Sequence, residues 1–186
     1  MVAVPVTTRF CWTHVAQMTL LQPSVGLPDF WTGSGFEEKL LQAQGDFSLN
    51  AGQHSVTYLP NDETTATGRY QVLLYDNNFG AAESYPKFDW GQLGAAVVTD
   101  YSRGSYSFGR IFTVDEVART YGLEDQIAVP FSGYVSSVQR VGNSNSMLVA
   151  SGQAKTFAEY DRCGLPIATY EMEAEKYIYR VYKYNL

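Results

Sequence analysis

The chain has 186 residues and a formal net charge of −6, from 13 Lys and Arg against 19 Asp and Glu. This length fits a single domain with its own core, so we expect one domain over residues 1–186. The acidic balance and the lack of a basic cluster argue against a nucleic-acid partner and against binding to anionic membrane surfaces. No apolar run approaches the roughly 20 residues of a membrane helix. The first residues show no basic region followed by an apolar core, which predicts a cytoplasmic protein.

The aromatic content is unusual, with 14 tyrosines, 10 phenylalanines and 3 tryptophans. Aromatic residues are enriched in strands, and a tyrosine ring packs while its hydroxyl seeks a hydrogen-bond partner. The composition therefore favours a β-rich protein with polar groups among its packed rings.

Strand patterns dominate the first half of the chain. Residues 9–21 alternate, so Phe10, Trp12 and His14 share one face in an extended conformation. Residues 22–35 are rich in proline and glycine and predict a loop, and residues 1–35 would form an N-terminal extension or lid. Further strands are expected at Phe36–Ala43, Asp46–Asn50, His54–Leu59 and Arg69–Asp76, followed by a long loop over 77–94 and a hairpin of Ala95–Tyr101 with Ser105–Thr113.

One short helix is expected in the middle of the chain. Thr113 and Glu116 have the spacing of a capping box, and Gly122 would end the helix after Tyr121.

The last third again predicts strands. Residues Ala128–Val141 would form one strand, with Pro130 at an edge or bulge. Met147–Ser151 and Lys155–Tyr160 follow. Ile167–Tyr184 would form the last strand, with a bulge near Lys176 where the alternation shifts by one, although its Glu and Lys content also suits a helix.

These elements predict an all-β protein. About eight to ten strands without a βαβ rhythm indicate an antiparallel closed β-barrel of about eight strands or, as the alternative, a β-sandwich. A barrel of about eight strands is filled by side chains or holds one small ligand. The sequence leaves both architectures open.

The candidate pocket residues follow from the aromatic faces. A cavity would be lined by polar and aromatic side chains, of which we select Trp12, His14, Glu38, Tyr75, Tyr101 and Tyr134. A histidine in a cavity can exchange a proton, and a carboxylate in apolar surroundings can act as a general acid. The plainer alternatives are a hydrogen-bonded interior histidine and an exposed carboxylate.

Two further groups of residues belong to these hypotheses. Trp31 and Trp90 lie on the predicted loops and would act as lids over the cavity, or else pack on the surface. Arg69 and Arg110 lie within strands, where each is either solvated or available to orient a substrate.

Motifs for other chemistries are missing from the sequence. The cysteines Cys11 and Cys163 and two histidines do not form a zinc pattern, so no metal site is expected. We expect the two cysteines to be reduced thiols, with a disulfide as the alternative. There is no nucleophile elbow and no phosphate-binding glycine loop, so no cofactor is expected either.

One stretch resembles a known family. The run Gly35-Phe-Glu-Glu-Lys-Leu-Leu-Gln-Ala-Gln-Gly-Asp-Phe-Ser-Leu49, with Gly52 before the strand at Ser55–Leu59, is similar to a pattern of allene-oxide-cyclase-like barrels, a family that includes the spirotetronate [4+2] cyclases (Diels-Alderases). The resemblance implies a cofactor-independent cyclase of polyketide biosynthesis that acts by shape and hydrogen bonding.

The expected function is therefore binding of an apolar small molecule, followed by its cyclisation. A lipocalin-like carrier with the same cavity and a structural or interaction β-sandwich are the alternatives. The sequence also leaves a homodimer open.

Overall fold

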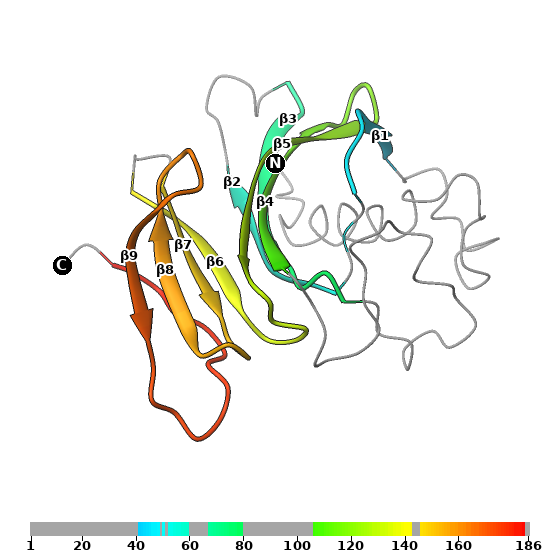
Figure 1. The fold of residues 1–186 in the computed structure, drawn as a ribbon. Helices are drawn as coiled ribbons and strands as arrows, with labels where there is room; N and C mark the ends of the chain where they lie inside the picture. The colour runs from blue at the N-terminus through cyan, green and yellow to red at the C-terminus, as the bar shows by residue number, and fades with distance from the viewer. Residues whose placement is uncertain are drawn as a thin grey trace, which may run out of the picture.

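Strands form the architecture of the part of the chain that the structure, a computed structural model, describes (Figure 1). These are residues 41–48, 50, 52–59, 67–79, 106–142 and 146–184. Their strands are β1 Gln42–Gln44, β2 Gln53–Leu59, β3 Arg69–Asp76, β4 Tyr106–Asp115, β5 Thr120–Pro130, β6 Ser137–Val141, β7 Ser146–Ser151, β8 Thr156–Tyr160 and β9 Pro166–Glu171.

The first sheet has the strand order β1-β5-β4-β3-β2. β3 and β4 form an unbroken antiparallel ladder from Arg69 opposite Asp115 to Asp76 opposite Phe108. The short β1 is parallel to β5, whereas the other neighbours in this sheet are antiparallel. β3 is an interior strand of this sheet, because its nearly continuous apolar run places buried residues on both of its faces.

The second sheet has the order β6-β7-β8-β9, in which each strand pairs with its neighbours in the sequence. β6 and β9 are therefore its two edges. Figure 1 shows this sheet beside the first one, with β9 on the side away from it.

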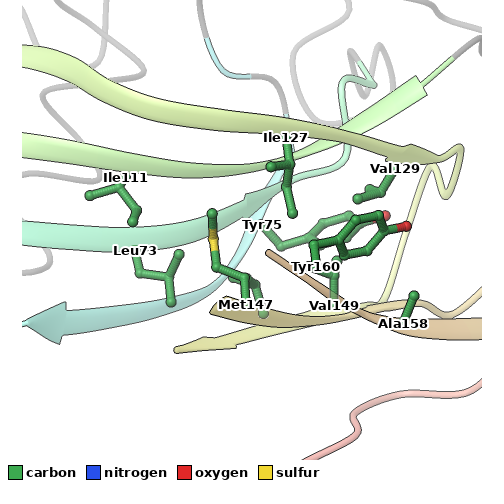
Figure 2. Close-up of a cluster of buried hydrophobic side chains, with 10 residues drawn as sticks. Leu73, Tyr75, Ile111, Ile127, Val129, Met147, Val149, Ala158 and Tyr160 are labelled. Carbon is green, nitrogen blue, oxygen red and sulfur yellow. The ribbon is translucent and has the colours of Figure 1, made fainter. Parts of the chain in front are cut away.

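The core lies between the two sheets. Leu73 of β3 and Ile111 of β4 point toward Met147 and Val149 of β7 (Figure 2). All four belong to one cluster of buried side chains that β3, β4, β5, β6, β7 and β8 supply. Burial of this apolar surface from both sheets holds them together.

The all-β prediction is confirmed, but the closed barrel is not found. The described strands form two open sheets, which agrees with the β-sandwich alternative. Arg69–Asp76 has the predicted bounds, and the strands at His54–Leu59 and Met147–Ser151 differ by one residue each.

The predicted helix after Thr113 is wrong. β4 continues to Asp115, a turn occupies residues 116–119, and β5 begins at Thr120. The Asp115 carboxylate accepts a hydrogen bond from the Ala118 amide at 2.8 Å, and Arg119 has a positive φ of 58°. Asp115, which lies between the two residues of the expected capping box, therefore stabilises a hairpin turn, because the same side-chain-to-backbone bonds suit caps and turns alike.

Three predicted strands also end earlier than expected or are missing. The strand expected over Ala128–Val141 stops at Pro130, and residues 131–136 leave the sheet before β6. Val135 and Ser136 have φ values of 54° and 95° there, which lie outside the extended range of a regular strand. The strand expected over Asp46–Asn50 is not formed where it is described, since residues 46–48 and 50 lie outside the strands.

The strand expected over Ile167–Tyr184 stops at Glu171, so the predicted bulge near Lys176 is also wrong. Residues 172–184 instead form an extended strap without strand pairing. The Ile178 amide donates to the Gly152 carbonyl at 3.1 Å, and the Val181 amide donates to the Ser137 hydroxyl at 3.1 Å.

Several expectations concern residues outside the described ranges. These are the strand at 9–21, the loop at 22–35, the part of the expected loop over 80–94, the strand at Ala95–Tyr101 and the lid formed by 1–35. Among the described residues, no helix is long and apolar enough to cross a membrane.

Candidate functional site

A buried ion pair lies on the face of the first sheet that is turned away from the second sheet. Arg110 of β4 is opposite Leu74 of β3, which places it diagonally beside Asp76. Arg110 Nη1 lies 3.0 Å from Asp76 Oδ2, and the two side chains are 1% and 0% exposed. Desolvating two charges is costly, so such a pair needs further hydrogen bonds to be tolerated.

The segment around residues 48–50 supplies these hydrogen bonds. Arg110 Nη1 donates to the Ser48 carbonyl at 2.9 Å and to Asn50 Oδ1 at 2.8 Å, while Nη2 donates to Ser48 Oγ at 2.7 Å. The guanidinium carbon also lies 4.6 Å from the centre of the Phe108 ring. Arg110 therefore fastens this segment to the sheet.

One donor of Arg110 is left over. Its Nε–H has no hydrogen-bond partner among the described residues. Burial lowers the pKa of Arg110, and the neighbouring Asp76 carboxylate opposes that shift. An arginine remains charged under these conditions, so the site holds a permanent cation with one unused donor.

Three aromatic rings pack beside this ion pair. Phe47, Phe112 and Tyr121 contact one another, with ring centres 5.7 to 5.9 Å apart. The Tyr121 hydroxyl is buried, and among the described residues it has no hydrogen-bond partner. Burial raises the pKa of Tyr121, so its hydroxyl keeps its proton and can only donate or accept a hydrogen bond.

We call this group the Arg110 site, and it consists of Phe47, Ser48, Asn50, Asp76, Arg110, Phe112 and Tyr121. It combines a buried cation, aromatic rings and a phenol that has no hydrogen-bond partner among the described residues. Guanidinium donors favour anionic oxygens, and aromatic rings favour an aryl group. Because Arg110 is fully buried, a ligand reaches its Nε–H only after the residues that cover it move.

A second polar cluster lies between the sheets, near the end of β3. The Tyr75 hydroxyl lies 3.2 Å from Ser151 Oγ, and Ser107 Oγ donates to the Asn77 carbonyl at 3.0 Å. Ser136 Oγ donates to Ser132 Oγ at 2.9 Å. The hydroxyls of this cluster bond one another and the backbone, which marks a structural network that holds the loop at residues 131–136.

Two of the predicted pocket residues lie in the described part of the chain, and both border this network. Tyr75 is fully buried in the core between the sheets, on the opposite face of β3 from Asp76. Tyr134 is half-buried, its carbonyl accepts a hydrogen bond from Ser132, and its ring lies 4.7 Å from that of Tyr177. Neither belongs to the Arg110 site.

The remaining candidates, Trp12, His14, Glu38 and Tyr101 for the pocket and Trp31 and Trp90 for the lid, lie outside the described residues. They stay predictions.

The sequence pointed to part of the Arg110 site. Arg110 was a candidate, whereas Arg69, the other strand arginine, is largely exposed and pairs with Asp115 at 2.7 Å. Asp76 was missed, although a carboxylate directly after the apolar run of β3 was a usable signal. Tyr121 was missed because it was assigned to the helix that does not form.

No metal-binding group is visible in the described part of the chain. Nowhere in it do three His, Cys, Asp or Glu side chains gather closely enough to hold an ion. Cys163 is an exposed free thiol there.

Comparison with known proteins gives one family. The model of the arylsulfotransferase (ASST) family matches residues 20–183. No curated protein matches the chain.

This match covers most of the chain and overturns the earlier resemblance. The protein is not a member of the allene-oxide-cyclase-like family, and the expectations of a [4+2] cyclase, of polyketide biosynthesis and of a lipocalin-like carrier were wrong. The expectation of an enzyme holds, since the matched family consists of transferases. Its β-rich character also agrees with the two sheets.

Proposed function

The chain belongs to the arylsulfotransferase family, and we propose that it transfers a sulfuryl group from an aryl sulfate donor to an acceptor hydroxyl. In this reaction the bond between sulfur and the aryl oxygen breaks, and a bond between sulfur and the acceptor oxygen forms. The acceptor proton ends on the departing phenolate. The products are a phenol and a new sulfate ester, so no further reactant is consumed.

The family match over residues 20–183 is the observation that carries this proposal. The Arg110 site supports it through its chemistry. A sulfuryl group presents three anionic oxygens, and the Nε–H of Arg110 is a charged donor without a partner among the described residues.

The aryl part of the donor finds matching groups in the same place. Phe47, Phe112 and Tyr121 offer ring edges and faces to a phenyl group. The Tyr121 hydroxyl would donate a hydrogen bond to the ester oxygen, on which negative charge develops as the bond to sulfur breaks.

A sulfuryl group could bind Nη1 and Nη2 of Arg110 only if Ser48 and Asn50 moved. Ser48 and Asn50 occupy Nη1 and Nη2 of Arg110 in the closed arrangement. A sulfuryl group would replace these contacts with its own oxygens, so binding and opening would be coupled.

The test is an assay with 4-nitrophenyl sulfate as donor and a simple phenol as acceptor. Release of 4-nitrophenol is followed by absorbance, and the sulfated acceptor is identified by mass spectrometry. We expect Arg110→Lys to lower the rate by about 100-fold, the typical loss for one donor to a developing charge. Tyr121→Phe should lower it less.

Arg69→Lys is the matched control, because Arg69 is an exposed strand arginine outside the site. It should retain the rate of the unaltered protein, and circular dichroism should show that all three variants are folded. No sulfated product from the unaltered protein, across a panel of aryl sulfates and phenols, would refute the proposed function. Product formation that Arg110→Lys leaves unchanged would refute the assigned site alone.

A further inference from the structure

Among the described residues, the strand β9 forms an edge of the second sheet with no strand on its outer side. It pairs with β8 on one side, and Figure 1 shows it at the end of the sheet farthest from the first sheet. An open edge of this kind is a template for pairing with another chain.

The pairing of β9 with β8 shows which backbone amides and carbonyls of β9 point away from β8. Tyr170 is opposite Phe157, and the Met172 amide donates to the Lys155 carbonyl at 2.9 Å. In an antiparallel ladder the residues between such positions turn their amide and carbonyl to the other side. Thr169 and Glu171 therefore direct these groups away from β8, toward the open edge.

The side chains around this edge are unusually apolar for a surface. Leu165, Ile167, Tyr170 and Met172 are 63%, 61%, 51% and 40% exposed. Natural edge strands are usually protected by lysines, bulges or inward-pointing charges. β9 has no lysine, and its one proline, Pro166, stands at its first position. Its one register shift against β8 also lies at this end, between Pro166 and Ala168, so the strand from Ala168 onward is regular.

The ring of Tyr170 is also held in a fixed orientation. It stacks on Phe157 of β8, with ring centres 4.7 Å apart and planes 11° from parallel. An aromatic side chain that is already ordered loses little conformational entropy when a partner covers it.

We propose that β9 is the interface with a second copy of this chain. Two β9 strands would pair antiparallel about a two-fold axis at Thr169, and the two four-stranded sheets would become one sheet of eight strands. Thr169 would face Thr169 of the second copy, and Ala168 would face its Tyr170. No like charges lie opposite each other within the strand.

The charges at the two ends of β9 favour this arrangement over a parallel one. Arg162 lies exposed in the turn before β9, and the carboxylates of Glu171, Glu173 and Glu175 lie exposed at its far end. Antiparallel pairing brings the start of one strand beside the end of the other, which places Arg162 near the acidic end of the second copy. A chain with a net charge of −6 repels its copies elsewhere, so this local match helps to select the contact.

Sedimentation velocity over a series of protein concentrations tests the proposal. The contact area of one strand pair is at the small end for protein interfaces, so we expect a dimer that dissociates on dilution. Thr169→Pro should abolish it, because proline removes the outward amide while the bonds to β8 remain. Val117→Lys, at an exposed apolar residue far from β9, should leave the dimer unchanged.

Cross-linking provides a second test that does not depend on the stability of the proline variant. In a Cys11→Ser, Cys163→Ser background, Thr169→Cys should form a disulfide between two copies under mild oxidation. Directly opposite residues of an antiparallel pair have the Cα separation that a disulfide requires. Ala154→Cys, at an exposed turn position, should not cross-link.

Two outcomes would overturn the proposal. One is a monomer at every concentration with no cross-link through position 169. The other is a dimer that Thr169→Pro leaves intact, because a different surface would then mediate it.

Discussion

At the scale of single residues, the pair of Arg110 and Asp76 is the most demanding feature of the described structure. Both side chains are fully buried, and the guanidinium makes further contacts to Ser48 and Asn50. Removal of one partner leaves the other as an unpaired charge in the interior. We expect Asp76→Ala to lower the free energy of unfolding by about 3–5 kcal/mol, measured by urea denaturation.

The double variant Arg110→Met, Asp76→Leu checks the physical reason. It removes both charges and fills the space with apolar atoms, so it should be less destabilised than Asp76→Ala alone. If instead it loses as much stability as the sum of the single variants, the contribution of the pair is not electrostatic.

The buried tyrosines make the protein sensitive to alkali. Burial raises the pKa of Tyr75 and of Tyr121 above the unfolded value of about 10. Their contribution to stability is fully present below that value and is lost as pH rises toward the folded values, because only the unfolded chain releases these protons. The free energy of unfolding should therefore fall above about pH 10, by up to about 1.4 kcal/mol per pH unit for each tyrosine.

Urea unfolding between neutral and alkaline pH measures this slope. Tyr121→Phe should reduce the slope of the free energy of unfolding against pH by the contribution of one tyrosine. Tyr184→Phe, at an exposed residue, should leave this slope unchanged. Equal slopes for the unaltered protein and Tyr121→Phe would show that Tyr121 does not hold its proton in the folded state.

At the scale of elements, sequence reasoning succeeded where local pattern and packing agree. β3 has the predicted bounds because its apolar run is flanked by turn residues and both its faces are covered. It failed at the turn after Asp115, because a polar side chain such as that of Asp115 can bond the backbone of either a helix start or a hairpin turn. The choice there depends on the pairing of β4 with β5, which is a long ladder that no short window reveals.

The candidate site shows the same limit. A buried arginine in a strand can be recognised as unusual from sequence, but its partners Ser48, Asn50 and Asp76 come from separate segments. The sheet register brings Asp76 beside Arg110, whereas Ser48 and Asn50 reach it from residues outside the strands.

The strap of residues 172–184 depends on a close approach at Gly152. A Cβ atom at this position would lie 2.0 Å from the Ile178 carbonyl oxygen, so only glycine allows the strap to pass. Gly152→Ala should displace the strap and expose the amides of Ile178 and Val181. Hydrogen exchange should show faster exchange at these two amides than in the unaltered protein.

Ala154→Ser, an exposed position in the same turn, is the control and should exchange at the unaltered rate. If Gly152→Ala leaves the exchange of both amides unchanged, the strap does not depend on the close approach at Gly152.

At the scale of the whole molecule, the two sheets share one core and should unfold together. Leu73 on β3 and Met147 on β7 belong to the same buried cluster, although they come from different sheets. Replacing either residue with alanine should lower the free energy of unfolding by about 2–5 kcal/mol, through lost burial and the cavity that remains. Because the sheets depend on each other, each variant should destabilise both.

Calorimetry and denaturation followed at two probes test this coupling. A fluorophore attached to Cys163 reports the second sheet, in a Cys11→Ser background, while far-ultraviolet circular dichroism reports both sheets. We expect coincident transitions in the unaltered protein and in Leu73→Ala, with the midpoint of both shifted equally by the substitution. If Leu73→Ala shifts the circular dichroism transition but leaves the Cys163 signal at its original midpoint, the second sheet is stable by itself. The shared core would then join two units that fold separately.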